Sequence, residues 1–370
     1  MSAANLWTRL PYDGRGFLAP DDERYTRLRE RGAANFWRKM PEGLRGPAIA
    51  MTRLASAVAA FWRVQAFVRA TELDHRAARR LFGDCLASGA HPSEAFIWRE
   101  IFGGRHPLPG RSAELLLASL GDAAAHRLLA DKQATAELLA HRGLAMPVTY
   151  AVARRGGIVD LSRVPSGALF VTPRRGGWRA GFAIDSADAA RAAALARDDD
   201  LLLQEHLRAA ASLSDLATDG AAPVLQLTTA RNPGSAPYLH AAFLAVPVPG
   251  EPRRDFRRGY LRVPIDPASG ALKEGLWFAE PGRRFARARW NDAPLAGRKM
   301  PAFTEAVARV LRAMELLPGL ALVNWDVIVT ARGPVILEGN TGGDWILSCL
   351  GATPGPLIDL LMRWSDVKST

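Results

Sequence analysis

The first third of the chain has apolar residues at every third or fourth position, a spacing that predicts helices. The expected helices cover residues 52–71, 76–88, 94–102 and 113–129. The stretches ASGAHPSEA and HPLPGRS, rich in helix-breaking residues, separate them. Residues 48–70 are apolar but include Arg53, Arg63 and Arg69, so we expect a packed or interfacial amphipathic helix there and no membrane span.

The rest of the chain shows short apolar runs between turn residues, which predicts strands mixed with helices. The segment DKQATAELLAHRGLAMP predicts a helix that Gly143 ends, with a strand after Pro147. Two strands joined by a glycine-containing turn are expected in ALFVTPRRGGWRAGFAI, and a helix at residues 186–196. Further strands are expected in DLLLQEHL, PVLQLTTA, YLHAAFLAVPV and YLRVPID, with a loop at residues 251–259. Helices followed by mixed strands and helices predict an α+β protein.

The stretch VNWDVIVTARGPVILEGNTGGDW contains two apolar runs, and each carries a carboxylate. Asp326 interrupts the first run, and Glu338 ends the second run, two residues before Asn340. The turn TARGP, with Gly333, predicts a hairpin. Side chains two residues apart on a strand share a face, so Glu338 and Asn340 should point the same way, with Asp326 in reach. A helix with Pro301 in its first turn is expected just before, in PAFTEAVARVLRAMELL.

These acids need a partner, because a buried carboxylate without one is costly. Two carboxylates and an amide oxygen on one surface suit Mg²⁺, which keeps several waters and binds nucleotide phosphates. The alternative is that Asp326 and Glu338 form salt bridges at the surface or at the hairpin end. For an Asp, then Glu-x-Asn, then Thr341-Gly342-Gly343, the metal site is the better-supported interpretation.

Composition narrows the class of protein. The 370 residues exceed one average domain, and the net charge of +11 comes mainly from dispersed arginines. No long block of like charges appears, so we expect either anionic small ligands or a polyanionic neighbour, and no nucleic-acid partner. Cys85 and Cys349 make no disulfide framework, which fits a reducing, cytoplasmic location. The stretch MSAANLWTRLPYDGRG has no apolar core, so no signal peptide is expected.

Several of these motifs resemble the ATP-grasp superfamily. The segment NWDVIVTARGPVILEGNTGG resembles its metal-binding hairpin, and DKQATAELLAHRGLAMP resembles the lysine-bearing helix that precedes a Gly-x-x-x-Pro strand start. The segment ALFVTPRRGGWRAGF resembles the strand and glycine-rich loop over the triphosphate, and LLLQEHL resembles the hinge at adenine. The likeness covers roughly residues 125–350 and is greatest to the sugar-transfer-associated subgroup.

The resemblance implies an ATP-grasp fold with three parts: an N-terminal helical region (1–125), an N-lobe with the glycine-rich loop (126–205) and a C-lobe with a substrate loop and the metal hairpin (206–370). It also implies a ligase that uses ATP and Mg²⁺ to phosphorylate a carboxylate and join it to an amine or other nucleophile. Its substrates would be a small-molecule or sugar-linked carboxylate and a nucleophilic acceptor, in polysaccharide or natural-product biosynthesis.

The same resemblance assigns roles to individual residues of this sequence. Metal ligands would be Asp326, Glu338 and Asn340. Catalytic arginines would be Arg231, Arg257 and Arg258. The nucleotide would contact Lys132, Thr172, Arg174, Arg175, Gly176, Gly177, Gln204, Glu205, His206 and Leu207.

Two positions depart from the family pattern. Thr172 stands where the family has a lysine that contacts the α- and β-phosphates, and Gln226 stands where the subgroup has an arginine. Arg174 or Arg175 would then replace the lysine charge, whereas Lys132 is either a nucleotide ligand or a lysine on the helix surface. Two hypotheses remain open: an active ligase, and a degenerate ATP-grasp protein that binds nucleotide or a partner without turnover.

Overall fold

The structure is a computed structural model of the chain. It describes residues 40–71, 74–88, 120–154, 164–175, 182–185, 200–218, 220–249, 260–274, 276–277, 286–287, 295–341 and 354–367, together with 92, 95, 96, 99, 117 and 162. The helix expected at 186–196 and the loop expected at 251–259 lie outside the described residues, and so does most of the helix expected at 94–102.

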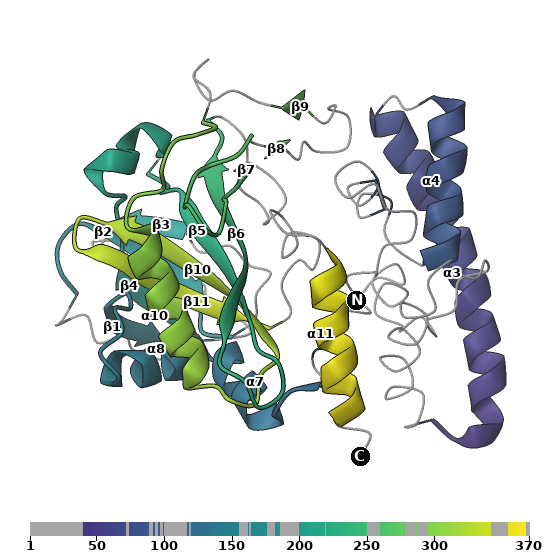
Figure 1. The fold of residues 1–370 in the computed structure, drawn as a ribbon, viewed down its shortest axis with the longest axis horizontal. Coiled ribbons are helices and arrows are strands. Elements are labelled where there is room, and N and C mark those ends of the chain that lie inside the picture. The colour runs from purple at the N-terminus through teal and green to yellow at the C-terminus, as the bar shows by residue number, and fades with distance from the viewer. Residues whose placement is uncertain are drawn as a thin grey trace.

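Two helices stand at one side of the molecule (Figure 1), α3 (Glu42–Thr71) and α4 (His75–Ser88). They confirm the helices expected at 52–71 and 76–88, although α3 begins ten residues earlier than the pattern indicates. Their C-terminal and N-terminal parts pack together through a small apolar cluster that includes Ala60, Val64 and Leu81. Among the described helices, none is long and apolar enough to cross a membrane.

Two short helices follow, α7 (Ala123–Ala130) and α8 (Lys132–His141). An aspartate caps each N-terminus: Asp122 accepts a hydrogen bond from the Ala124 amide, and Asp131 accepts one from the Ala134 amide. The extended backbone at Asp122 makes a single helix over 113–129 wrong. The predicted end of α8 at Gly143 is confirmed.

A four-stranded antiparallel sheet contains β1 (Thr149–Ala153), β2 (Ala168–Pro173), β3 (Phe182–Asp185) and β4 (Leu201–Glu205), in the order β1-β4-β2-β3. Alternate residues bury one face, where Leu169, Val171 and Leu203 pack together. Thr172 and Gln204 lie on the other face, because Thr172 is opposite Leu202 and Gln204 is two residues further along β4.

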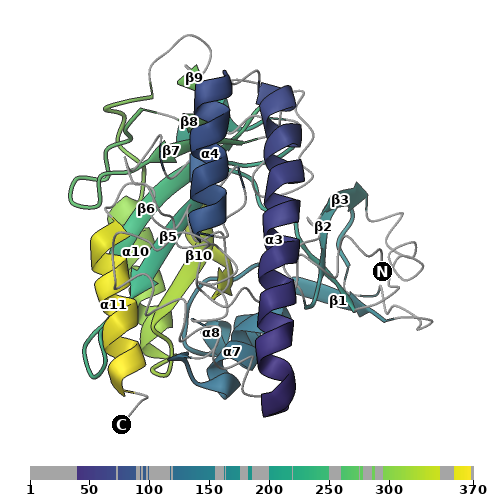
Figure 2. The ribbon, with the colours of Figure 1, turned by 90° about the vertical axis from the view of Figure 1, so that its right-hand side faces the viewer.

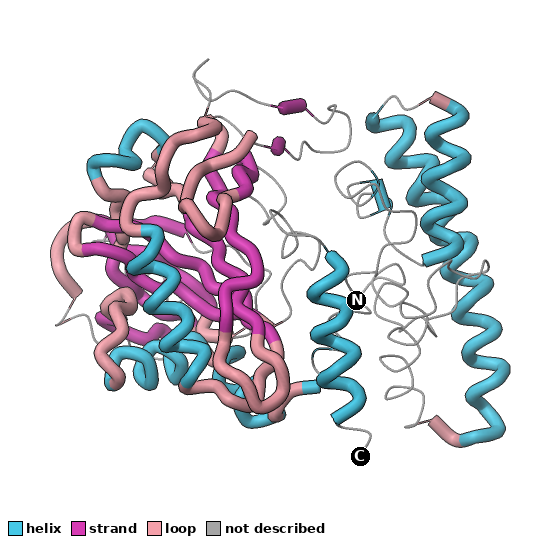
Figure 3. The backbone as a smooth tube through the Cα atoms, viewed as in Figure 1, coloured by secondary structure: helices cyan, strands magenta, loops and turns pink. Residues whose placement is uncertain are grey.

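A larger antiparallel sheet has the order β11-β10-β5-β6-β7-β8-β9. Its strands are β5 (Val224–Ala230), β6 (Tyr238–Pro247), β7 (Tyr260–Pro264), β8 (Leu276–Trp277), β9 (Ala286–Arg287), β10 (Leu322–Thr330) and β11 (Gly333–Asn340). A short 3-10 helix, η2 (Ala211–Leu216), precedes it. Helix α10 (Phe303–Glu315) packs on this sheet and lies in front of it in Figure 3. Helix α11 (Pro354–Val367) is the last described element.

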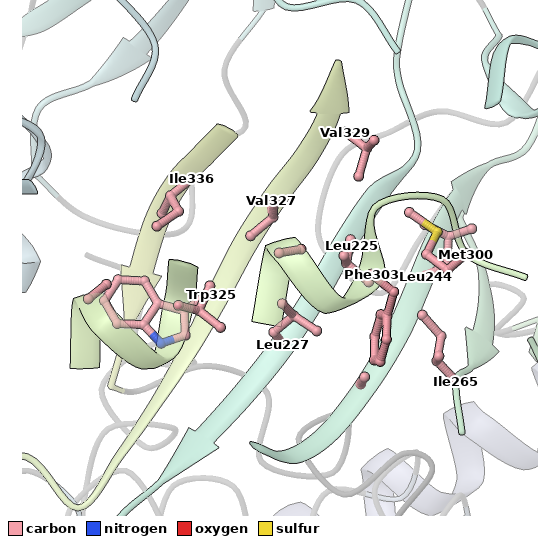
Figure 4. Packing of buried hydrophobic residues seen from close by; sticks show 14 of the residues in the cluster. Leu225, Leu227, Leu244, Ile265, Met300, Phe303, Trp325, Val327, Val329 and Ile336 are labelled. Atoms are coloured by element: carbon pink, nitrogen blue, oxygen red, sulfur yellow. The ribbon is translucent and has the colours of Figure 1, made fainter. Parts of the chain in front are cut away.

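The main core lies between the large sheet and α10. Leu225, Leu227 and Leu244 from β5 and β6 pack with Trp325 and Val327 of β10 (Figure 4). Burial of each such side chain contributes about 1.5–3 kcal/mol to the free energy of folding when the side chain is fully removed from water. Since strand side chains alternate, the residues between these apolar positions point to the opposite face of the sheet.

The expected hairpin, α10 and all strands named from the sequence are confirmed, with small shifts at element ends. Pro301 lies just before α10 and not in its first turn, because Ala302 precedes the helix in a left-handed conformation. The α+β class is therefore confirmed. The division at residues 125 and 205 stays a prediction.

Candidate functional site

Polar side chains form a continuous row on the face of the large sheet that points away from α10. Asp326 of β10 is directly opposite Glu338 of β11 on one side and Gln226 of β5 on the other. One step along, Asn324 is opposite both Asn340 and Thr228. Directly opposed residues of antiparallel strands share a face, so the hairpin brings the two acids and Asn340 together as the sequence indicates.

Glycine at position 339 permits this arrangement. Gly339 points to the core side, and a Cβ there would lie 2.7 Å from the Trp325 ring and 3.0 Å from the Leu129 side chain. The Trp325 ring is held in place, because its indole N–H donates to the Thr229 hydroxyl at 2.8 Å. The sequence Glu-Gly-Asn therefore alternates two polar side chains with the only residue that fits under the indole.

Each acid has a hydrogen-bonding partner on this face. The Gln226 amide donates to Asp326 Oδ1 at 2.5 Å, and the Asn340 amide donates to Glu338 Oε1 at 3.0 Å. The ammonium group of Lys132 lies 2.8 Å from Glu338 Oε2. The same ammonium group donates to the Thr172 hydroxyl at 3.0 Å, so it links the small sheet to the acid row.

The two carboxylates have opposite pKa shifts. Burial raises the pKa of Asp326 to about 7, and the neighbouring Glu338 carboxylate adds to the rise. Burial also opposes ionisation of Glu338, but Lys132 and Asn340 outweigh it and hold the pKa of Glu338 below its usual value. Of the two carboxylates, Glu338 is therefore the one that is paired with a cation of the protein, the Lys132 ammonium.

The donor set fits a magnesium ion that also binds phosphate and water. No group of three or more His, Cys, Asp or Glu side chains in the described part of the chain is arranged to hold a metal. Two facing carboxylates and one amide are too few for a closed protein cage, but they are hard oxygen donors on one surface. The repulsion between Asp326 and Glu338 is a feature that a divalent cation would relieve.

Lys132 is not a lysine on the helix surface. It is the first residue of α8, its backbone N–H donates to the Arg174 carbonyl at 3.0 Å, and its side chain is only 16% exposed. This places its charge beside Thr172, the position where the resemblance leads one to expect lysine. Whether this lysine serves a nucleotide stays a prediction.

Arg174 and Arg175 instead turn toward Asp131, the cap of α8. The Arg174 guanidinium donates to Asp131 Oδ1 at 2.9 Å and approaches Asp200 at 3.5 Å. Arg175 lies 3.2 Å from Asp131 and is 65% exposed. Burial opposes ionisation of Asp131, but the hydrogen bonds from Arg174, from the Ala134 amide and from Arg175 prevail and lower the pKa of Asp131 to about 2. That Arg174 or Arg175 supplies the phosphate contact of the lysine missing at Thr172 stays a prediction.

The expected adenine and ribose residues lie at the end of β4. Gln204 is buried and donates to the Thr149 hydroxyl at 3.1 Å. Glu205 forms an ion pair with Arg332 in the hairpin turn, and the His206 ring contacts the Gly220 carbonyl at 3.2 Å. Leu207 is buried against Ile328 and Val335. The segment thus joins the small sheet to the hairpin of the large one.

Arg231 does not lie with the acids, which corrects its expected place in the site. It follows the end of β5, five residues beyond Gln226, and its guanidinium donates to the Met314 carbonyl of α10 at 2.9 Å. At about 3.3 Å per residue, that places it roughly 16 Å along the strand from the acid row. The remaining expected site residues lie outside the described residues: Gly176, Gly177, Arg257 and Arg258.

Arg262 is a site candidate that sequence reasoning missed. It is fully buried on β7, opposite Ala245, and therefore on the same face as Phe243, Gln226 and Asp326. Its guanidinium lies 5.7 Å from the Phe243 ring centroid and 5.1 Å from that of Tyr260. Its charge acts to lower the pKa of Asp326, against the dominant effect of burial. The available signal was a charged residue inside the apolar run YLRVP.

Comparison with known proteins gives likenesses in structure only. No protein-family model and no curated protein sequence matches the chain. The chain is similar to D-alanine–D-alanine ligase from Coxiella burnetii, with 12% identity and a TM-score of 0.41, over 67% of this chain and 61% of that one. It is also similar to ATP-grasp ligase PsnB complexed with minimal precursor, with 17% identity and a TM-score of 0.40, over 69% and 70%.

A third similar structure is N5-carboxyaminoimidazole ribonucleotide synthetase from Thermotoga maritima. Its identity is 14% and its TM-score 0.35, over 59% of this chain and 43% of that one. The chain thus spans less than two thirds of the synthetase and of the Coxiella ligase. The sugar-transfer-associated subgroup stays a prediction.

Proposed function

We propose that this chain is an ATP-dependent carboxylate ligase of ATP-grasp architecture. The observation that carries the proposal is the Lys132 ammonium, which lies 2.8 Å from Glu338 and 3.0 Å from the Thr172 hydroxyl. It puts a fixed cation beside two facing carboxylates, where two antiparallel sheets come together. Such a site suits a magnesium-bound triphosphate, because phosphoryl transfer mainly needs positioning and charge neutralisation.

The residues of the site have distinct tasks in this proposal. Asp326, Glu338 and Asn340 would hold Mg²⁺, which when bound neutralises charge on phosphate oxygens. Lys132 binds phosphate oxygens and is kept charged and in place by Glu338. Thr172 orients the lysine by accepting its hydrogen bond. Arg262, whose guanidinium lies near the rings of Phe243 and Tyr260, supplies a second positive charge on the same sheet face.

The proposed reaction has two steps. A carboxylate oxygen of the substrate attacks the γ-phosphorus of ATP, the bond to the β,γ-bridging oxygen breaks, and ADP leaves. The resulting acyl phosphate is then attacked at carbon by an amine or other nucleophile, which loses a proton as inorganic phosphate departs. Arg257 and Arg258 would lie over the acyl phosphate and help to exclude water, a role that stays a prediction. We propose a small-molecule or sugar-linked carboxylate as the acid.

The test is product analysis with a matched pair of variants. The full chain is incubated with Mg·ATP and a pool of acids and amines, and the expected products are ADP, phosphate and a condensed product. Glu338→Gln is expected to abolish ADP formation and magnesium-dependent ATP binding. The same change at the exposed Glu137 on α8 serves as the control. AMP and pyrophosphate as products would contradict the proposed chemistry, and unchanged Mg·ATP affinity in Glu338→Gln would contradict the metal ligands.

The second candidate is a nucleotide-binding protein without turnover. It is favoured by one contact: the Gln226 amide donates to Asp326 Oδ1 at 2.5 Å, where the family resemblance leads one to expect an arginine. A neutral amide lacks the positive charge with which an arginine would stabilise the charge that develops during phosphoryl transfer. Tight Mg·ATP binding with no ADP release across the acid and amine pool would favour this candidate over the ligase.

A further inference from the structure

The long helix α3 has two apolar faces. Within the described part of the chain, one of them packs against α4, and the ring centroid of Phe61, at the edge of the other, lies 6.0 Å from that of Phe82 in α4. Ala60 and Val64 are buried together with Leu81 and Cys85 of α4. Other large apolar side chains of α3 are 45–66% exposed: Leu44, Met51, Leu54, Val58, Phe61 and Trp62. We call these six side chains the outer stripe.

The outer stripe is continuous along the helix. Its members follow one another at spacings of seven, three, four and three residues, with Trp62 four residues after Val58, and such positions lie on one side of a helix. From Leu44 to Phe61 it runs for roughly 26 Å at 1.5 Å per residue. Figure 2 shows α3 on the side of the molecule that faces the viewer, in front of both sheets.

Exposed apolar side chains that form one continuous face differ from single exposed residues. Soluble proteins tolerate isolated ones, whereas contiguous patches mark contact with another molecule or with a membrane. The stripe also contains adjacent aromatic residues, with the Phe61 and Trp62 rings 5.6 Å apart edge to face. Tryptophan is favoured where one side of a surface is apolar and the other is wet.

Two partners could cover the outer stripe, a second copy of the chain or a membrane surface, and the charge of α3 distinguishes between them. Helix α3 carries four arginines, Arg45, Arg53, Arg63 and Arg69, but its single acidic residue is Glu42 in the first turn. A second copy would bring the same excess of arginine, and the helix offers no acidic residues along its length to pair with it. An anionic lipid surface complements both the arginines and the apolar stripe. The chain as a whole adds a net charge of +11.

We propose that α3 docks the protein on the surface of an anionic membrane, with the outer stripe in the interfacial region and Arg45, Arg63 and Arg69 at the headgroups. The helix lies on the membrane and does not span it. This inference is independent of the proposed function, because the stripe shares no residue with the acid row.

The test measures sedimentation of the full chain with phosphatidylcholine vesicles, with and without phosphatidylglycerol. We expect binding only to the vesicles that contain phosphatidylglycerol, weakened by added salt. The double variant Met51→Gln/Leu54→Gln should bind about tenfold less, since two partly inserted apolar side chains are lost. Arg69→Gln should bind about fivefold less, the effect of one arginine near a charged surface.

Controls separate these effects from misfolding and from general charge loss. Val367→Gln replaces an exposed apolar residue on α11, and Arg80→Gln removes an exposed charge on α4. Both should bind as the unmodified chain does, and all variants should keep the thermal unfolding midpoint. No binding to anionic vesicles, or equal binding by the stripe variants, would overturn the proposal. So would a dimer in solution that the double variant converts to monomer while vesicle binding is absent.

Discussion

Replacing Lys132 by methionine is the most direct test of the site, because it removes one charge and keeps a side chain of similar length. In the structure the ammonium group contacts Glu338 Oε2 at 2.8 Å and the Thr172 hydroxyl at 3.0 Å. Hydrogen bonds to charged groups contribute about 1.5–3 kcal/mol. If Lys132 makes one such bond to a phosphate, Mg·ATP affinity should fall by a factor of about 10 to 150.

The same change has a smaller effect on stability. Glu338 would lose its cation while it remains beside Asp326. Its pKa would rise, because burial raises the pKa and Lys132 would no longer lower it. The two side chains are 16% and 21% exposed, so solvent screens part of their attraction. We expect the free energy of unfolding to fall by about 1–2 kcal/mol. Urea unfolding of Lys132→Met and of the Lys132→Met/Glu338→Gln double variant would measure how strongly the pair is coupled.

The assay is isothermal calorimetry with ATP, ADP and AMP in the presence of magnesium. A phosphate contact requires that Lys132→Met weaken ATP and ADP much more than AMP. Lys273→Met removes an exposed lysine whose backbone N–H donates to the Pro264 carbonyl at the end of β7, and it provides the matched control. Equal loss for the three nucleotides, or unchanged ATP affinity, would refute the assignment of Lys132 to the phosphates.

Three further outcomes are expected. Gly339→Ala should lower the free energy of unfolding by about 1–3 kcal/mol in urea titrations, because the added methyl group would lie 2.7 Å from the Trp325 ring; an unchanged midpoint would show that the ring can move. Asp131, with a pKa of about 2 in the folded chain against 3.8 ordinarily, should contribute about 2 kcal/mol that is present above pH 4 and lost as the pH falls toward 2. Asp131→Asn, which can still cap α8, should remove that part of the acid dependence, and an identical acid profile would contradict the ion pairs. Arg262→Met should reduce kcat more than Mg·ATP affinity in steady-state and binding measurements; a loss of affinity alone would place Arg262 at the nucleotide.

The local pattern of apolar and polar residues was sufficient to predict the helices and strands that bury one face. The hairpin β10–β11 was predictable, because two apolar runs around a turn with Gly333 have one favourable pairing, and alternation then puts Glu338 and Asn340 on the same side. The helices α4, α8 and α10 followed from apolar spacing, and the end of α8 followed from Gly143. These features depend on neighbours within a few residues, which a sequence displays directly.

Partnerships between distant residues were decided only by the tertiary structure. Whether Lys132 lay on a helix surface or in the site depended on how α8 packs against both sheets, and its contacts are 40 residues away at Thr172 and about 200 residues away at Glu338. The family resemblance assigned Arg231 to the site, but its position beyond the end of β5 directs it to α10. Arg262 became a site candidate through strand order and register, because β7 pairs with β6, β6 with β5 and β5 with β10, which puts Arg262 on the sheet face of the acids. The residue types therefore indicated the chemistry, whereas the pairing of strands and helices determined which charges meet.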